Sequence, residues 1–506
     1  MQTSTRLSPW IWILAFLNIL LHLVFYQNLE YHRDELLYFS LGMHPAAGYA
    51  SVPPLVGLLA WVMGSLFGYS VLAVKLLPAL GSGVMVVLGA AIARELGGQK
   101  YAQLLAAVGM VIAPLMLRAF FLYQPVFLDI LFWTLSYFWL IRFLNTNSPT
   151  YLYALGATLG VGLLNKYLIA LLAFCLLLAL LVTNRTVFKN RAFYGAMALV
   201  FLVFSPNLVW QYLHDFPVAQ HMVALQDSQL VYVSRAGFLA EQLLFIFSVA
   251  PLVFMGLLFL FRHPTYRSVV LSTVLAVALL CLLRGKSYYT AGVYPTLIAA
   301  GAVGWERWLL RPVFRVLLPL LMTLTILPLL PMGLPIYPLE GLIAYFQQLD
   351  TKYGVDAGRR FEDGTLHQLP QDYADMLGWE ELTQLVHTAY HQTANKAQVL
   401  IYCENYGQAG AIMVIGRKYG LPEPISFHES FLYWAPGRLP QDIQEFIYVN
   451  DEMGEDIPRL FAEVREVGRI QNPYAREHGT RVYLCRQPKT SIRAMFLAKI
   501  PRMTPF

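Results

Sequence analysis

The sequence predicts a polytopic α-helical membrane protein with a soluble α/β domain at its C-terminal end. Of its 506 residues, 57% are hydrophobic and only 13% are charged, whereas soluble domains carry about 25% charged residues. The charge is also unevenly distributed, since residues 1–335 hold 19 Lys and Arg against 9 Asp and Glu, and residues 336–506 hold 17 against 21. We therefore expect a membrane domain over 1–335 and an extracytoplasmic domain over 336–506. The low charge content excludes a nucleic-acid-binding protein and a stand-alone soluble enzyme.

Apolar segments of membrane-spanning length recur through the first domain. A helix needs roughly 20 apolar residues to cross the hydrocarbon core. Windows of about that size predict eleven spans, at 9–27, 71–93, 101–118, 124–143, 150–165, 167–183, 192–211, 237–261, 268–283, 287–304 and 314–333. The segment 53–67 is ambiguous, because it has 15 residues and opens with two prolines. It is either a short span or a helix that lies in the interface.

The basic residues favour the interfacial alternative and set the orientation. With 53–67 in the interface, one set of loop ends, from Arg6 to Arg315, holds 12 Lys and Arg against two acids, and the other set holds seven of each. We therefore expect the N-terminus in the cytoplasm and the C-terminal domain on the outer side of the membrane.

The densest cluster of ionisable residues on the outer side follows the first span and reads Glu30-Tyr31-His32-Arg33-Asp34-Glu35. Ionisable groups near the membrane core are costly and are functional candidates by default. A solvated loop with a local salt bridge would explain the cluster equally well. The residues that follow, 36–44, are apolar, and Gly48-Tyr49 then leads to the double proline. We expect a carboxylate pair, Asp34 and Glu35, held over the membrane by two surface helices.

Cations near the outer ends of several spans complement these carboxylates. They are Lys75, Lys166, Arg235 and Lys286. Together they could converge on a phosphate, although each alone is more often a snorkelling anchor. The candidate substrate-binding residues are Tyr49, Tyr288, Tyr289 and His214. For His214, in the longest outer loop, a surface histidine on a short helix is the simpler interpretation.

The outer domain alternates strand and helix patterns, which is typical of an α/β layer domain. We expect strands at 399–403, 446–449 and 482–485, and helices at 408–419 and 460–467. Its two cysteines, Cys403 and Cys485, lie in expected strands. A disulfide between them is permitted outside the cell, and two buried thiols are an equally good interpretation.

A series of motifs runs in order along nearly the whole chain. They are Tyr31-His32-Arg33-Asp34-Glu35-Leu36-Leu37-Tyr38, Gly48-Tyr49, Pro53-Pro54-Leu55, Lys75-Leu76-Leu77-Pro78-Ala79-Leu80, Leu163-Leu164-Asn165-Lys166, Ser205-Pro206-Asn207-Leu208, Gly285-Lys286-Ser287-Tyr288-Tyr289, Tyr294-Pro295, Asn405-Tyr406-Gly407-Gln408-Ala409-Gly410-Ala411 and Tyr419-Gly420-Leu421-Pro422. In this order they resemble the bacterial family 39 glycosyltransferases, relatives of protein O-mannosyltransferases and of the aminoarabinose transferases that modify lipid A.

The resemblance implies a GT-C fold in a bacterial inner membrane and an inverting transfer of sugar from a polyprenyl-phosphate donor. The acceptor would be a lipid, a glycan or a protein, and membrane lipids would surround the helices. Asp34 then matches the family's general base with Glu35 in support, and Lys75, Lys166, Arg235 and Lys286 are candidates for the donor phosphate.

One departure concerns the metal. Relatives often carry an acidic residue just before the double proline, and in the aminoarabinose branch that acid resembles a metal ligand. Here the stretch reads Ala50-Ser51-Val52. A divalent metal is therefore doubtful, and we assign no metal ligand.

Two other classes of protein remain as alternatives. A polytopic transporter or a flippase of lipid-linked sugars would place polar groups at the membrane midplane and show repeated halves. Here the ionisable residues lie at span ends on one face, and no repeat is visible. A scaffolding membrane protein would leave Asp34, Glu35 and the outer cations without a role.

Overall fold

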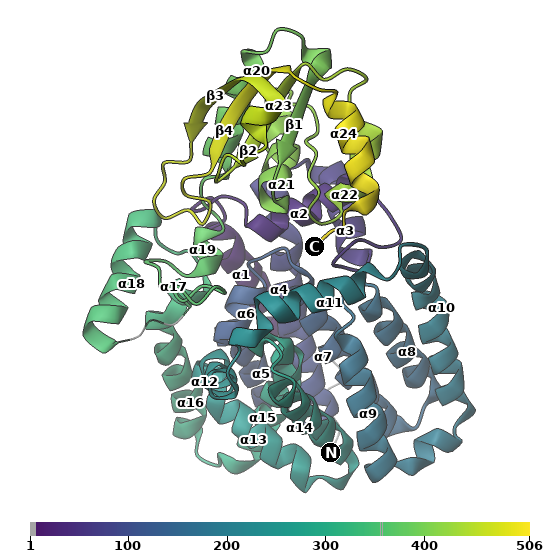
Figure 1. Cartoon of the computed structure of the whole chain (residues 1–506). Coiled ribbons are helices and arrows are strands. Elements are labelled where there is room, and N and C mark those ends of the chain that lie inside the picture. The colour runs from purple at the N-terminus through teal and green to yellow at the C-terminus, as the bar shows by residue number, and fades with distance from the viewer. Residues whose placement is uncertain (1–6, 355, 357) are drawn as a thin grey trace.

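The computed structural model describes residues 7–354, 356 and 358–506. Arg6, counted above among the cytoplasmic loop ends, lies outside the described residues. The molecule has a larger helical part and a smaller part, which packs on one end of it and contains a four-stranded sheet (Figure 1). The helices of the helical part are α1 (Pro9–Val24), α2 (Arg33–Met43), α3 (Leu55–Phe67), α4 (Val71–Glu95), α5 (Lys100–Ile112), α6 (Pro114–Ala119), α7 (Pro125–Thr146), α8 (Pro149–Leu163), α9 (Ile169–Thr183), α10 (Arg191–Leu213), α11 (Pro217–Ser228), α12 (Arg235–Ile246), α13 (Ala250–Arg262), α14 (Arg267–Leu282), α15 (Tyr294–Trp308), α16 (Pro312–Ile326) and α17 (Leu330–Gly333).

Helices occupy all eleven segments predicted as spans. Pro114 divides one of them into α5 and α6, because proline lacks the N–H that would continue the hydrogen-bond ladder. A 3₁₀ turn, η3 (Phe247–Val249), separates α12 from α13. Among the described residues, six helical stretches are long and apolar enough to cross a membrane by length and composition: Val71–Glu95, Pro125–Thr146, Arg191–Leu213, Arg235–Arg262, Pro264–Leu282 and Pro312–Gly333. The ambiguous segment forms α3, whose 13 residues are fewer than the roughly 20 needed to cross.

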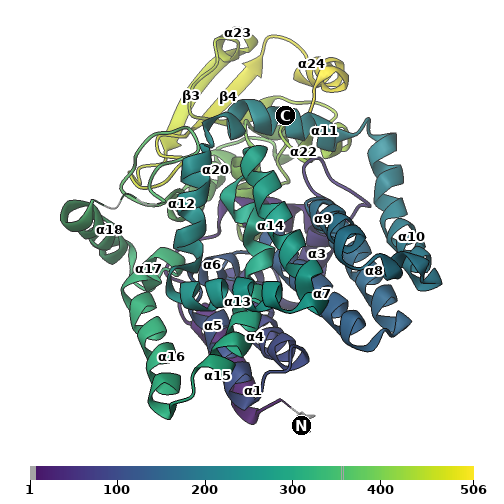
Figure 2. The same ribbon diagram turned by 90° about the horizontal axis from the view of Figure 1, so that it is seen from below.

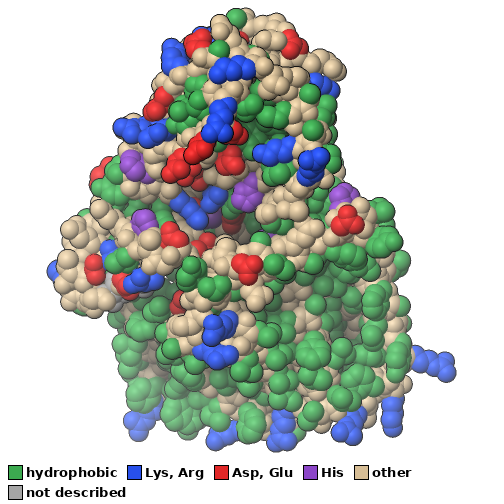
Figure 3. Space-filling view, in the orientation of Figure 1, with side chains coloured by type: hydrophobic (Ala, Val, Ile, Leu, Met, Phe, Trp, Pro, Cys, Tyr) green, Lys and Arg blue, Asp and Glu red, His purple; other side chains and the backbone are tan. Residues whose placement is uncertain are grey.

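The surface of the helical part is apolar. Figure 3 shows hydrophobic side chains covering its flank, Lys and Arg along its lower rim, and most of the acidic side chains nearer the sheet. Soluble monomers rarely expose an apolar area of this extent, so the surface is that of a multi-pass membrane protein. Both views place α8, α9 and α10 at one edge and α16 at the other (Figures 1 and 2).

Helix α18 (Leu339–Tyr353) lies at one side of the molecule beside α17 (Figures 1 and 2). The smaller part is an α/β layer. Its elements are α19 (Gln371–Ala374), α20 (Trp379–His391), β1 (Val399–Cys403), α21 (Tyr406–Val414), α22 (Phe431–Trp434), β2 (Glu445–Asn450), α23 (Ile457–Leu460), β3 (Phe461–Arg469), β4 (Arg481–Pro488) and α24 (Ile492–Lys499). The strand order is β1-β2-β4-β3. β1 and β2 are parallel, whereas β4 is antiparallel to both β2 and β3.

The two faces of the sheet pack into different cores, as the alternation of side chains along each strand requires. One face, with Ile401 and Leu484, joins the core that continues into the helical part. The other face, with Tyr402 and Phe446, packs against Phe496 of α24. Because the core is continuous, the boundary between residues 335 and 336 stays a prediction.

The strands at β1, β2 and β4 confirm the expected pattern, but the helix predicted over 460–467 is wrong. Residues Phe461–Arg469 form the edge strand β3, which pairs with β4. Their Glu and Arg residues are good helix formers, and hydrogen bonds to β4 override that local preference. The cysteines Cys403 and Cys485 are free and buried, and they lie in the cores on opposite faces of the sheet.

Candidate active site

The carboxylate pair lies in the first turn of α2. His32 caps this helix, because its Nδ1 accepts the backbone N–H of Asp34 at 3.1 Å while the Glu35 carboxylate accepts the backbone N–H of His32 at 2.9 Å. Such a capping box satisfies backbone donors at the helix start, and the helix dipole favours negative charge there. The local sequence therefore places both carboxylates at one end of α2.

Glu35 is fully buried and its hydrogen-bond partners all belong to the protein. It has no exposed surface, and it accepts hydrogen bonds from Lys75 Nζ at 2.6 and 2.8 Å and from the Tyr123 backbone N–H at 2.9 Å. With these partners and the cap of α2, Glu35 ties α2 to α4 and to the loop before α7. These contacts are those of a residue that positions α2.

Lys75 has a different role from the one predicted. Its ammonium group contacts Glu35 and lies 4.4 Å from the Phe121 ring centroid, and the residue is 2% exposed. A cation that is buried and paired in this way cannot turn toward a phosphate without leaving a buried carboxylate uncompensated. We therefore reassign Lys75 from phosphate binding to the support of α2.

Asp34 is half-buried and is held by groups from two distant segments. Gln124 Nε2 donates to Asp34 Oδ2 at 2.9 Å, and the Tyr406 hydroxyl donates to Oδ1 at 2.9 Å. A carboxylate oxygen has lone pairs for about two hydrogen bonds. Each Asp34 oxygen therefore retains room for a proton, which is the requirement for a general base.

Helix α21 places Tyr406 on Asp34. Asn405 caps this helix, with its Oδ1 accepting the N–H groups of Gly407 and Gln408 at 2.9 and 3.1 Å. A Cβ atom at Gly410 would lie 3.0 Å from Leu36 of α2, and one at Gly407 would lie 2.8 Å from the Arg33 side chain. Small residues thus allow α21 to pack closely on α2, and this contact brings the sheet-containing part to the carboxylate pair.

Two of the predicted cations, Lys166 and Lys286, are within electrostatic range of each other. The ammonium of Lys166 lies 5.0 Å from the Tyr288 ring centroid and 4.5 Å from that of Tyr289, and the carboxyl group of Asp129 is also within electrostatic range of it. Within the described residues the Lys166 ammonium has no hydrogen bond or salt bridge, whereas Lys286 donates to Glu362 at 2.7 Å. Tyr288 is in turn within electrostatic range of Asp34, so this tyrosine is near both the carboxylate and Lys166.

The other predicted site residues lie apart from Asp34 or in the core. Arg235 is exposed at the start of α12 and donates to the Leu282 carbonyl.

Tyr49 is 2% exposed and donates to the Leu41 carbonyl at 3.1 Å. Packing therefore explains Tyr49, and we withdraw it as a substrate-binding residue. His214 stacks on Trp210 with ring centroids 4.0 Å apart and lines a pocket of about 290 Å³ together with Tyr433.

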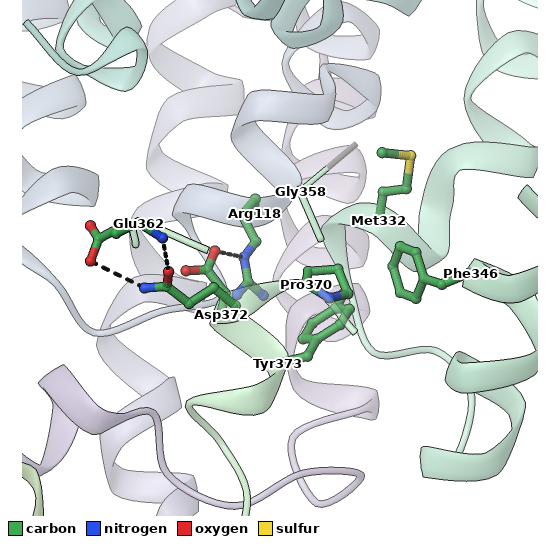
Figure 4. Close-up of a pocket in the computed structure, with 9 residues that line it drawn as sticks. Arg118, Met332, Phe346, Gly358, Glu362, Pro370, Asp372 and Tyr373 are labelled. Atoms are coloured by element: carbon green, nitrogen blue, oxygen red, sulfur yellow. Dashed lines mark hydrogen bonds and ion pairs between the residues drawn. The ribbon is translucent and has the colours of Figure 1, made fainter. Parts of the chain in front are cut away.

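A pocket of about 270 Å³ lies beside the cations (Figure 4). Arg118 lines it and donates to Asp372 at 2.8 Å through Nε, while its buried Nη1 and Nη2 atoms have no hydrogen-bond partner among the described residues. Burial would raise the pKa of Asp372, but the charges of Arg118 and His32 hold that pKa well below its usual range. Glu362, the partner of Lys286, lines the same pocket.

The sequence alone does not single out several residues of this region. Arg118 is one of many cations at helix ends, and Tyr406 is only part of a motif. No sequence pattern indicates a role for Gln124 or Glu429, because each is a single polar residue far from Asp34 in the chain. Glu429 lies in the loop before α22, is 5% exposed and has Ser51 within hydrogen-bonding reach.

The described residues offer no ready metal site. Nowhere among them do three His, Cys, Asp or Glu side chains gather in a group that could hold a metal ion. The segment Ala50-Ser51-Val52 has no acidic residue of its own. The residues present do not fit a bound divalent metal, and no step of the chemistry below is routed through one.

Comparisons with known proteins agree with this arrangement. Residues 51–210 match the family model described as dolichyl-phosphate-mannose-protein mannosyltransferase, whereas no curated protein matches the sequence significantly. The crystal structure of ArnT from Cupriavidus metallidurans bound to undecaprenyl phosphate is similar with a TM-score of 0.64 and 14% identity, over 94% of this chain and 98% of that one. The apo state of the same protein has a TM-score of 0.63 and 12% identity, over 94% and 97% of the two chains. The chain therefore shares the fold of ArnT over nearly its whole length, which confirms the fold that the motifs predicted, and the family model matches within the helical part.

Proposed function

We propose that the protein is an inverting glycosyltransferase that moves a sugar from a polyprenyl-phosphate donor to a hydroxyl group of an acceptor, with Asp34 as the general base. The observation that carries this proposal is the position of Asp34. It is a half-buried carboxylate with free lone pairs, held by Gln124 and Tyr406, and Tyr288, which is within its electrostatic range, also contacts Lys166. The similar ArnT structure contains undecaprenyl phosphate, which supports a polyprenyl-phosphate donor here.

The reaction needs a base and a site for the leaving phosphate. The acceptor oxygen forms a bond to the anomeric carbon while the bond from that carbon to the phosphate oxygen breaks. Asp34 takes the acceptor's proton, and the polyprenyl phosphate leaves with the electron pair. Positioned proton transfer contributes about 10²–10⁴-fold to rates. A single displacement inverts the anomeric carbon, so Asp34 acts as base and not as nucleophile.

The leaving phosphate needs cations rather than an acid, because it departs as an anion. Lys166 and Lys286 are within electrostatic range of each other. Arg118, whose Nη atoms have no partner among the described residues, lines one pocket with Glu362, the partner of Lys286. Fixed positive groups in a site shielded from water stabilise developing charge with little reorganisation. We therefore assign the donor phosphate to this cluster.

We place the reaction on the outer face of a bacterial inner membrane. The basic lower rim in Figure 3 supports a cytoplasmic position for the end of the helical part away from the sheet. The site lies at the opposite end, where the sheet domain meets α2. A flippase would need its polar groups near the midplane, and the groups around Asp34 lie at one end of the helices.

A transfer assay tests this function. The purified protein in liposomes would receive undecaprenyl phosphate carrying a radiolabelled hexose, pentose or aminoarabinose, with bacterial lipid, glycan and protein fractions as acceptors. We expect label in one acceptor fraction, an equal amount of released undecaprenyl phosphate and an inverted anomeric configuration. Movement of intact donor across the bilayer without release of undecaprenyl phosphate would instead identify a flippase.

A further inference from the structure

Glu429 is held in an uncommon backbone conformation at the junction of the two parts. Its φ is +59°, in the left-handed region that residues other than glycine seldom adopt. Its backbone N–H donates to the Pro505 carbonyl at 2.8 Å, and the next residue, Ser430, accepts the backbone N–H of Ala50 through Oγ at 2.9 Å. Strained conformations persist only where the surroundings determine them, and they cluster at functional sites.

The carboxyl group of Glu429 is buried with one oxygen unused. The residue is 5% exposed, and its Oε2 has no hydrogen-bond partner among the described residues. No Lys or Arg in the described part of the chain forms a salt bridge with it. A buried polar atom without a partner costs free energy, and such atoms in a native structure call for an explanation. A ligand that bonds to Oε2 supplies that explanation.

Several groups face the carboxyl group of Glu429. They are the carboxylate of Asp34 and the hydroxyls of Tyr38 and Tyr433, with Ser51 within hydrogen-bonding reach, where it favours the ionised form. Burial raises the pKa of Glu429 to about 8, and the charge of Asp34 acts in the same direction. At neutral pH the group is therefore a carboxylic acid, which can donate a hydrogen bond as well as accept one.

We propose that Glu429 is a second carboxyl group of the active site, supplied by the outer domain, which hydrogen-bonds the acceptor beside Asp34. This inference rests on the proposed function, because it gives Glu429 a role only where an acceptor hydroxyl meets the base. Glu429 donates to an acceptor oxygen, while Asp34 takes the proton of the reacting hydroxyl. Tyr433, which faces Glu429, also lines the pocket that contains His214, and this pocket gives room for the rest of the acceptor.

The pH dependence follows from this arrangement. Above about pH 8 Glu429 ionises, which removes the donor and adds a second negative charge near Asp34. We therefore expect the acceptor kcat/KM of the wild-type enzyme to fall as the pH rises through about 8. The Glu429→Gln variant cannot ionise, so its profile should stay level through that range.

The test compares three variants in the transfer assay described above. Glu429→Gln keeps the shape and a donor group, and Glu429→Gly removes the side chain at a φ that glycine adopts without strain. Glu455→Gln, at an exposed acid of the same domain, is the matched control. We expect Glu429→Gly to raise the acceptor KM about tenfold, the loss expected for one hydrogen bond, with the donor KM unchanged. Glu429→Gln should stay within about threefold of wild type at pH 7.

Infrared difference spectroscopy gives a readout independent of turnover. A protonated carboxyl band that titrates near pH 8 should be present in the wild type and absent in Glu429→Gln. The proposal is overturned if that band is missing, if Glu429→Gly leaves the acceptor KM unchanged, or if Glu429→Gln is inactive at pH 7. A wild-type enzyme without transferase activity would instead overturn the proposed function, and the role of Glu429 with it.

Discussion

The carboxyl group of Asp34 accepts one hydrogen bond on each oxygen, from Tyr406 and from Gln124. Its neighbour Glu35 accepts hydrogen bonds from Lys75, Tyr123 and His32 and is fully buried. Two carboxylates that are adjacent in the sequence therefore have different environments. Under the proposed function, this difference favours Asp34 for the proton transfer and Glu35 for the support of α2.

The sequence predicts the acidic pair, and the resemblance implies this division of roles, but neither indicates the contacts that distinguish the two carboxylates. Lys75 was a reasonable candidate for the phosphate because it lies near a span end, and only its contact with Glu35 shows otherwise. Lys166 and Lys286 were chosen on the same grounds, and the structure brings them together near Tyr288. The distances between such side chains depend on helix packing, which residue spacing does not determine.

Removing either lysine near Tyr288 should weaken donor binding. We expect Lys166→Gln and Lys286→Gln each to raise the donor KM about tenfold or more, because charge-assisted hydrogen bonds contribute ~1.5–3 kcal/mol. Steady-state kinetics with the polyprenyl-phosphate sugar would measure this effect. Arg235→Gln is the matched control, since this exposed cation contacts the Leu282 carbonyl. Equal effects in all three variants would argue against a phosphate site at Lys166 and Lys286.

Helix α2 is the element on which the site depends. Its cap orients the carboxylates, its ion pair with Lys75 fixes it to α4, and α21 packs on it through Gly407 and Gly410. Apolar windows of membrane-spanning length predict all eleven helical segments, because membrane helices carry a strong local signal. The edge strand β3 was missed, because its pairing with β4 is a long-range interaction that its helix-forming residues do not reveal.

Breaking the buried ion pair should destabilise the protein. We expect Lys75→Met to lower the free energy of unfolding by about 3–5 kcal/mol, because it leaves the buried Glu35 uncompensated. The double variant Glu35→Gln with Lys75→Met should recover much of that loss. Thermal unfolding in detergent would measure both, with Lys418→Met at an exposed pair as the control. A single variant as stable as that control would contradict the structural role of Lys75.

At the scale of the whole molecule, one continuous core joins the sheet domain to the helical part. Composition and charge predicted the two parts, but not that the second completes the site of the first. Tyr406 lies 372 positions from Asp34 in the chain, and Glu429 reaches Ser51 across a similar separation. Contacts of this kind arise from the docking of one part on the other, so a single sequence gives no local sign of them.

The central claim is that Asp34 is the general base. Its most direct test is the single-turnover rate of Asp34→Asn with saturating donor and acceptor. The equilibrium affinity of the same variant for the polyprenyl-phosphate sugar is measured beside it. Asparagine keeps the shape of Asp34 but cannot take a proton, and the exposed Asp227→Asn is the control. We expect the rate of Asp34→Asn to fall about 10²–10⁴-fold, while its donor affinity and thermal stability stay at wild-type values. A rate close to that of the wild type would show that Asp34 is not the base.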